Sequence, residues 1–108
     1  MSELSAEDQK LVTLARATMA RTRAAEGAAV RDLDGRTYAA ASVDLTSLTL
    51  SALEVCVAMA VSSGSAGLEA AVRLGDDAAP DLRAVRELGG ADVVIHLGDP
   101  RGQVTGTA

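Results

Sequence analysis

The sequence of 108 residues contains no phenylalanine, no tryptophan and a single tyrosine, Tyr38. Its hydrophobic content of 48% therefore comes almost entirely from alanine, valine and leucine. Small side chains let backbones approach closely, but each buries little apolar area. We therefore expect contacts between subunits to supply part of the stability, which predicts an oligomer.

Cysteine, basic charge and long apolar runs are also scarce. Cys56 is the only cysteine, so it cannot form an intramolecular disulfide or build a thiolate metal site alone. Ten basic residues against 15 acidic ones give a net charge of -5, which argues against nucleic acid as a partner. The longest apolar run, Val55 to Val61, is far shorter than the ~20 residues of a membrane helix. The acidic start, MSELSAEDQK, is unlike a signal peptide, so we expect a cytoplasmic protein without a membrane partner.

The periodicity of apolar residues predicts a single α/β domain over residues 1–108. Helices are predicted over about residues 5–24, within 46–64 and within 76–90, the last with Pro80 in its first turn. Strands are predicted in a hairpin over 27–43 that turns at Asp34-Gly35, then over 68–74, 91–97 and 103–107. The order helix-strand-strand-helix-strand-helix-strand, with a short final strand, calls for a mixed sheet of four to five strands covered by helices.

Glu54 is the only residue with a formal charge between Asp44 and Glu69. A carboxylate inside an apolar element is costly unless something pairs with it. Ser51 and Glu54 fit the capping box S-x-x-E, in which the two side chains satisfy free amides of the first helical turn. Two interpretations of Glu54 therefore stay open, a helix cap and a functional carboxylate.

Three further residues have simple structural interpretations. Cys56 is predicted to be a small buried core residue. His96 is predicted to face solvent or a hydrogen-bonding neighbour, with a pH-sensing or binding role as the alternative. Asp81 is predicted to lie in the first turn of the third helix, where the helix dipole favours a negative charge.

Three segments of the chain carry a family likeness: GAAVRDLDGRTY, ALEVCVAMAVSSGSAGLEAAVRLGD and PDLRAVREL. With these segments the chain resembles the cytidine deaminase family, most closely its branch of short nucleoside deaminases that includes blasticidin S deaminase. The likeness extends from about Gly27 to Gly106. It implies a three-layer α/β/α fold and, in active members, a Zn²⁺ ion held by one His or Cys and two further Cys. It also implies a glutamate that moves protons for the zinc-bound water.

The resemblance places Ala52, Asp81 and Ala84 at the three positions that hold zinc in this family. An alanine methyl group cannot coordinate zinc, and one aspartate does not replace three ligands. We therefore expect a degenerate member of the family that uses no zinc and no other cofactor. Glu54 stands at the position of the proton-moving glutamate and is a remnant of the catalytic group.

The ribose-binding segment of the family is also altered. Where its members have an asparagine and a glutamate that hold the ribose, this chain has Ser42 and Asp44. These residues keep a hydroxyl and a carboxylate on shorter side chains. The resemblance thus leaves Ser42 and Asp44 as candidate substrate-binding residues.

These observations favour a catalytically inactive protein on the cytidine deaminase fold, acting as an oligomeric interaction or assembly module. Because the second predicted helix is apolar on most sides, a homotetramer, which is typical of the family, is expected, with a homodimer as the alternative. Two other functions stay open. One is a cytidine or nucleoside deaminase that retains activity through Glu54 and Asp44, and the other is a protein that binds nucleosides without reaction.

Overall fold

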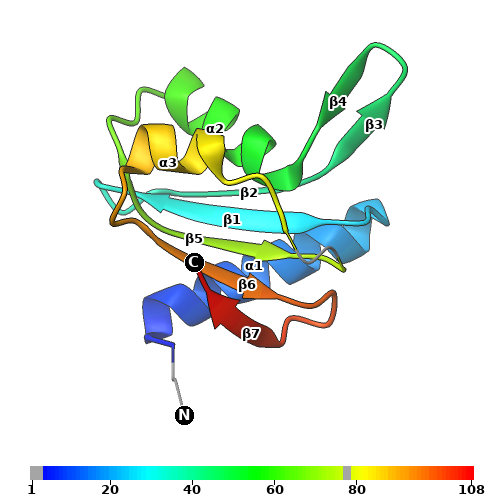
Figure 1. Ribbon diagram of the computed structural model, residues 1–108, viewed down its shortest axis with the longest axis horizontal. Helices are drawn as coiled ribbons and strands as arrows, with labels where there is room; N and C mark the ends of the chain where they lie inside the picture. Colours follow the sequence, from blue (N-terminus) through cyan, green and yellow to red (C-terminus); the bar gives the residue numbers. More distant parts are fainter. Residues whose placement is uncertain (1–3, 77–78) are drawn as a thin grey trace.

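The structure is a computed structural model that describes residues 4–76 and 79–108. The helices are α1 (Ala6–Thr22), α2 (Ala52–Ser62) and α3 (Arg83–Gly89). The strands are β1 (Gly27–Asp32), β2 (Thr37–Ala41), β3 (Val43–Leu45), β4 (Leu48–Leu50), β5 (Leu68–Leu74), β6 (Val94–Gly98) and β7 (Val104–Thr107). Five of these strands form one sheet in the order β2-β1-β5-β6-β7, while β3 and β4 form a separate hairpin (Figure 1).

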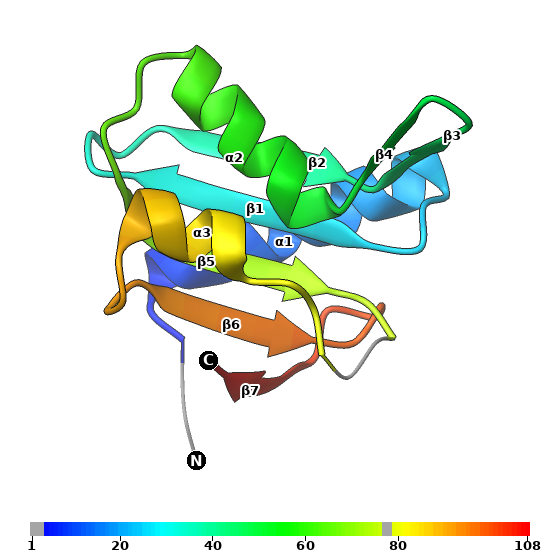
Figure 2. The same cartoon turned by 45° about the horizontal axis from the view of Figure 1, so that its top comes forward.

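The large sheet is mixed, as the sequence predicts. β5 and β6 are parallel, whereas the β1–β2, β1–β5 and β6–β7 pairs are antiparallel. Helix α1 covers one face of the sheet, and α2 and α3 lie side by side over the other face (Figures 1 and 2). The predicted three-layer α/β/α fold is therefore confirmed.

Helix α1 begins and packs as its sequence predicts. The N-cap residue Ser5 accepts a hydrogen bond on its side-chain oxygen from the backbone N–H of Asp8, at 3.1 Å. The buried residues of α1 recur at helical spacing and pack against one face of the sheet: Leu11, Val12, Ala15, Thr18 and Met19. Gly27 of β1 lies so close to the backbone of Ala15 that a side chain there would collide with it. The small residues of this chain thus allow the helix to approach the sheet closely.

The opposite face of the sheet holds a second apolar cluster, under α2 and α3. Alternate residues of β1, Ala28 and Val30, point into this cluster together with Ile95 of β6. Cys56 of α2 is fully buried in it, which confirms the predicted core role of this residue. Helix α2 thus packs against β1 and β2 of the large sheet.

The predicted hairpin of β1 and β2 turns at Asp34-Gly35, where Gly35 has a φ of +85°. Asp32, only 1% exposed, organises this turn. One of its carboxylate oxygens accepts hydrogen bonds from the backbone N–H groups of Asp34 and Arg36, and the other accepts one from the hydroxyl of Ser65. The sequence predicts the turn but gives no sign of the contact with Ser65, which is 33 residues away.

The predicted order of elements is wrong between residues 43 and 50. This segment forms the β3–β4 hairpin, with Val43 opposite Leu50, and α2 begins only after it. The connection Thr46-Ser47 lacks the glycine or asparagine that usually marks a two-residue turn. The sequence of residues 46–50 therefore predicted the start of a helix instead of a hairpin. In Figure 1 the hairpin projects from the body of the molecule beside the start of α2.

The predicted start of the third helix is also wrong. Helix α3 begins at Arg83, so Pro80 and Asp81 precede it, and no acidic residue lies in its first turn. Asp81 instead accepts a hydrogen bond from the backbone N–H of Arg83 at 3.0 Å, which favours a turn over a helix at this point. Residues 77 and 78 of the predicted helix lie outside the described residues.

The last two strands follow the prediction with small shifts. The predicted strand over 91–97 is observed at Val94–Gly98, and the final run forms β7 at the edge of the sheet.

The helices α1, α2 and α3 are too short or too polar to span a bilayer. Within residues 4–76 and 79–108, no helix combines the length and the apolar character needed to cross a membrane.

Candidate functional site

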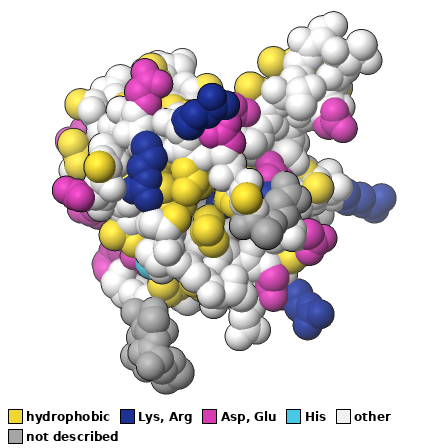
Figure 3. Space-filling view, in the orientation of Figure 1, with side chains coloured by type: hydrophobic (Ala, Val, Ile, Leu, Met, Phe, Trp, Pro, Cys, Tyr) yellow, Lys and Arg dark blue, Asp and Glu magenta, His cyan; other side chains and the backbone are white. Residues whose placement is uncertain are grey.

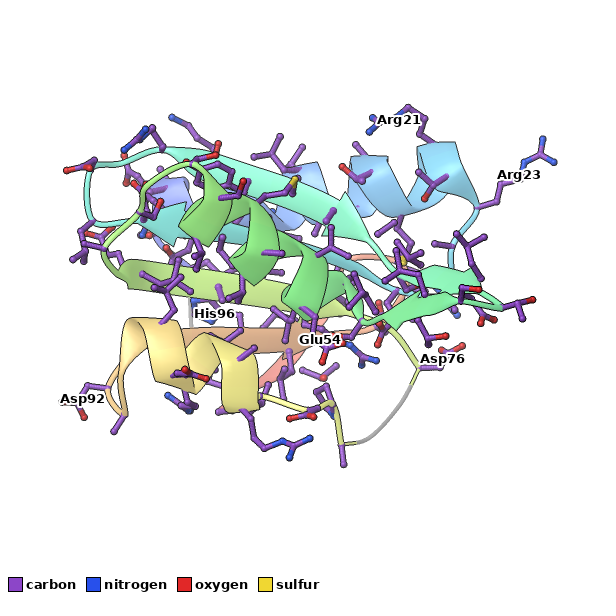
Figure 4. The ribbon with its side chains drawn as sticks, turned by 90° about the horizontal axis from the view of Figure 1, so that it is seen from above. Arg21, Arg23, Glu54, Asp76, Asp92 and His96 are labelled. Atoms are coloured by element: carbon purple, nitrogen blue, oxygen red, sulfur yellow. The ribbon has the colours of Figure 1, made fainter. Side chains whose placement is uncertain are left out.

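The first turn of α2 carries Glu54 at its third position (Figure 4). The Ser51 side-chain oxygen accepts a hydrogen bond from the backbone N–H of Glu54 at 3.1 Å. In return, Oε1 of Glu54 accepts a hydrogen bond from the backbone N–H of Ser51 at 2.8 Å. This reciprocal pair is the predicted capping box. The interpretation of Glu54 as a helix cap is therefore confirmed.

Ala52 precedes Glu54 by two residues and is fully buried. Its backbone N–H donates a hydrogen bond to Oε1 of Glu26 at 3.0 Å. The other carboxylate oxygen of Glu26 forms an ion pair with Arg73, which lies near the end of β5 and is only 2% exposed. A carboxylate and a guanidinium from outside the helix thus lie directly at the N-terminus of α2.

Sequence reasoning missed the pair of Glu26 and Arg73. The sequence does indicate that Arg73 is buried. Arg73 lies two residues after Ala71 in a strand, so both side chains point to the face covered by α2 and α3. An arginine on a core face needs a partner. The sequence does not identify that partner, since Glu26 is 47 residues away.

Just before α3, Asp81 is held by Arg83, the first residue of that helix. The Arg83 side chain donates hydrogen bonds to both carboxylate oxygens of Asp81, the shortest at 2.7 Å. These bonds lower the pKa of the Asp81 carboxyl to about 2. Ala84, the next position of the implied ligand set, has no donor atom on its side chain.

The residues at these positions do not fit a zinc ion. Ala52 and Ala84 offer methyl groups, and the backbone amide of Ala52 faces the carboxylate of Glu26. Arg73 places a fixed positive charge beside that carboxylate, where it opposes a second cation. In the part of the chain that the structure describes, no group of three or more His, Cys, Asp or Glu side chains is placed to hold a metal.

The candidate substrate-binding residues Ser42 and Asp44 lie together in one pocket. This pocket, of about 620 Å³, lies between the end of α1 and the β3–β4 hairpin and is also lined by Glu26 and Ser51. Glu54 is not among its lining residues. The structure therefore brings together Ser42 and Asp44, the candidate substrate-binding residues, but Glu54 does not line the same pocket.

His96 lies on the face of the sheet that α1 covers, because its strand neighbours Ile95 and Leu97 belong to the cluster under α2 and α3. It is 7% exposed, and its Nε2 is 2.8 Å from the carboxylate of Asp8 on α1. The second oxygen of Asp8 accepts a hydrogen bond from Arg31 at 2.8 Å. Burial alone would raise the pKa of the Asp8 carboxyl, but hydrogen bonds from Arg31 and His96 outweigh it and hold the pKa below its ordinary value of 3.8. The predicted hydrogen-bonding neighbour of His96 is confirmed, and it ties α1 to the sheet.

Comparison with solved structures shows the same fold in cytidine deaminases. The structure of the cytidine deaminase from Burkholderia pseudomallei aligns with a TM-score of 0.77 at 21% identity, over 97% of this chain and 92% of that one. The enzyme from Mycobacterium leprae aligns with a TM-score of 0.70 at 22% identity, over 94% of this chain and 93% of that one. The enzyme from Mycobacterium tuberculosis aligns with a TM-score of 0.71 at 28% identity, over 84% of this chain and 85% of that one.

No curated protein sequence matches the chain. The sequence profile of the cytidine deaminase-like family, in contrast, matches residues 4–102, which is most of the chain. The profile match and the shared fold agree with the resemblance seen in the sequence. This chain belongs to the cytidine deaminase-like family.

Proposed function

We propose that this protein is a catalytically inactive member of its family that works without zinc as an oligomeric interaction or assembly module in the cytoplasm. One observation carries the proposal: the N-terminus of α2 is closed by the chain's own side chains. Glu54 accepts a hydrogen bond from the amide of Ser51, and Glu26, paired with Arg73, accepts one from the amide of Ala52. Zinc lowers the pKa of a bound water from ~15.7 toward ~7, so without zinc hydroxide is scarce at neutral pH.

The surface supports self-association. Figure 3 shows apolar side chains gathered below α3 in the middle of the face in view, and Val61 of α2 is 55% exposed. Leu45 and Leu48, at the tip of the β3–β4 hairpin, are 62% and 48% exposed. Leu45 and Leu48 face each other across the hairpin, and contiguous exposed apolar patches are typical of contact surfaces between proteins. We propose a homotetramer, with a homodimer as the alternative.

Two measurements on the same preparation test this proposal. The protein is incubated with cytidine, deoxycytidine and blasticidin S, with and without added Zn²⁺, with the Mycobacterium tuberculosis enzyme as the positive control. Sedimentation velocity at micromolar concentration gives the mass of the assembly. We expect no conversion and a tetramer or dimer. Conversion that is lost in the Glu54→Gln variant would establish the alternative of an active deaminase, and a monomer would contradict the assembly role.

The pocket that contains Ser42 and Asp44 favours a second candidate function, nucleoside binding without reaction. The carboxylates of Asp44 and Glu26 and the hydroxyl of Ser42 line one space of about 620 Å³, and such groups accept hydrogen bonds from sugar hydroxyls.

A thermal-shift titration with cytidine distinguishes this second function. Specific binding predicts a rise in Tm that the Asp44→Ala variant loses. The matched control is Asp92→Ala, an exposed aspartate at the far end of α3 (Figure 4) that should keep the rise. No rise in the unaltered protein would contradict nucleoside binding.

A further inference from the structure

A groove on the α1 side of the molecule brings two arginines together. It lies between α1 and the turn that joins β6 to β7 and encloses about 340 Å³. Arg16 lines it from the middle of α1, and Arg101 lines it from the turn. The groove is separated by the sheet from the N-terminus of α2, so it is a different place in the fold from the site described above.

The turn that carries Arg101 has a defined shape. One carboxylate oxygen of Asp99 accepts hydrogen bonds from the backbone N–H groups of Arg101 and Gln103, at 2.9 and 3.0 Å. Gly102 has a φ of +91°, a conformation that favours glycine, and its N–H donates to the Asp99 carbonyl at 3.0 Å. A side chain at Gly102 would begin 3.2 Å from the Arg16 side chain, so the turn lies directly against the arginine of α1.

The charges in this groove are not balanced. Arg16 and Arg101 form no ion pair or side-chain hydrogen bond with any residue in the described ranges 4–76 and 79–108. No carboxylate lines the groove, although the chain as a whole has a net charge of -5. The pocket beside the β3–β4 hairpin, in contrast, contains both Glu26 and Asp44. Two unpaired guanidinium groups facing one space attract an anion.

The remaining lining residues indicate that the anion is a small organic molecule. Gln9 and Thr13 add polar groups on the same face of α1 as Arg16, while Val12 and Ala17 give the groove an apolar floor. Its volume is near the lower end of the range for small-molecule sites, which begins at roughly 300 Å³. We propose that this groove binds a small organic anion, with its phosphate or carboxylate group between Arg16 and Arg101 and its carbon atoms over the apolar floor. Arginine suits this role because its planar group donates paired hydrogen bonds to both anions.

The test follows backbone amide signals of the ¹⁵N-labelled full chain by NMR during titration with sodium phosphate, and separately with sodium acetate. Sodium chloride of equal ionic strength is the reference. The Arg16→Gln/Arg101→Gln variant removes both guanidinium groups. The matched control, Lys10→Gln/Arg21→Gln, removes the same charge from exposed residues of α1 that do not line the groove.

We expect saturable shifts confined to the groove, at Thr13, Arg16, Arg101 and Gly102. The affinity should fall by about tenfold or more in the Arg16→Gln/Arg101→Gln variant, because charge-assisted hydrogen bonds are lost, and should stay unchanged in the control. The anion with the higher affinity identifies the preferred group. Shifts that do not saturate, that spread evenly over the surface, or that are equal in the two variants would overturn the proposal. Zinc content and deaminase activity do not enter this test, so its result is independent of the proposed function.

Discussion

The backbone N–H of Ala52 donates a hydrogen bond to Oε1 of Glu26 at 3.0 Å, so a carboxylate from the connection between α1 and β1 closes the first turn of α2. Arg73 holds this carboxylate in place from β5. The family resemblance implies a metal-ligating side chain at position 52, where this chain has the methyl group of Ala52.

Replacing Arg73 by methionine should destabilise the fold strongly. Arg73 is 2% exposed and the Glu26 side chain is 16% exposed, so replacing Arg73 leaves a half-buried carboxylate without its cation. We expect the free energy of unfolding to fall by about 2 kcal/mol, less than the loss found when one partner of a fully buried ion pair is removed. Urea denaturation measures it, with Arg21→Met, an exposed arginine at the end of α1 (Figure 4), as the control. Equal stabilities of the two variants would show that the ion pair has no structural role.

The stability of the fold should tolerate glutamine at position 54 better than alanine. Because glutamine keeps an oxygen that can accept the hydrogen bond from the Ser51 amide, Glu54→Gln should cost less than about 1 kcal/mol of stability. Glu54→Ala removes the cap and should cost about 1 kcal/mol, as should Ser51→Ala. Thermal and urea unfolding of the three variants check the order. A large loss in Glu54→Gln alone would contradict the role of Glu54 as a simple cap.

Asp8 should contribute stability that disappears in acid. Its pKa is held below the ordinary value of 3.8, so its contribution is fully present above that value and is lost as the pH falls through the lowered pKa. At pH 7 the Asp8→Asn variant should be less stable by about 2 kcal/mol, because charge-assisted hydrogen bonds to Arg31 and His96 are weakened. Denaturation between pH 7 and pH 2 measures the difference, which should shrink toward acid. A difference that does not change with pH would rule out this linkage.

Cys56 should be chemically inert in the folded protein. The side chain is fully buried, and burial raises the pKa of its thiol to about 12. Since the thiolate is the reactive form, labelling with a disulfide reagent at pH 8 should be at least about a hundredfold slower than in denaturant. Rapid labelling of the folded protein would mean that α2 opens readily or that Cys56 is accessible.

Local sequence patterns predicted the parts of the fold that depend on neighbours in the chain. The cap at Ser5, the turn at Asp34-Gly35 and the capping box of Ser51 and Glu54 each involve residues within a few positions of one another. The β3–β4 hairpin was missed because its turn has no characteristic residue. The predicted start of α3 was wrong because Asp81 forms a turn with Arg83. Aspartate is common in such turns as well as in the first turn of helices, so its presence does not distinguish the two.

Local sequence patterns cannot predict the long-range contacts of the candidate site. Glu26 and Arg73 are 47 residues apart, and Asp8 and His96 are 88 residues apart. Only the register of the sheet and the packing of the helices bring these charges together. The sequence could identify which family positions had changed, but not that Glu26 accepts a hydrogen bond from the Ala52 amide and pairs with Arg73.

The most direct test of the account is the zinc content per chain, measured by plasma mass spectrometry on protein purified without chelator and without a metal-affinity tag. The closed N-terminus of α2 predicts fewer than about 0.1 zinc ions per chain, since Ala52 and Ala84 offer no ligand atoms. A value close to one zinc per chain, retained on dialysis, would contradict the account and require ligands other than those at the family positions.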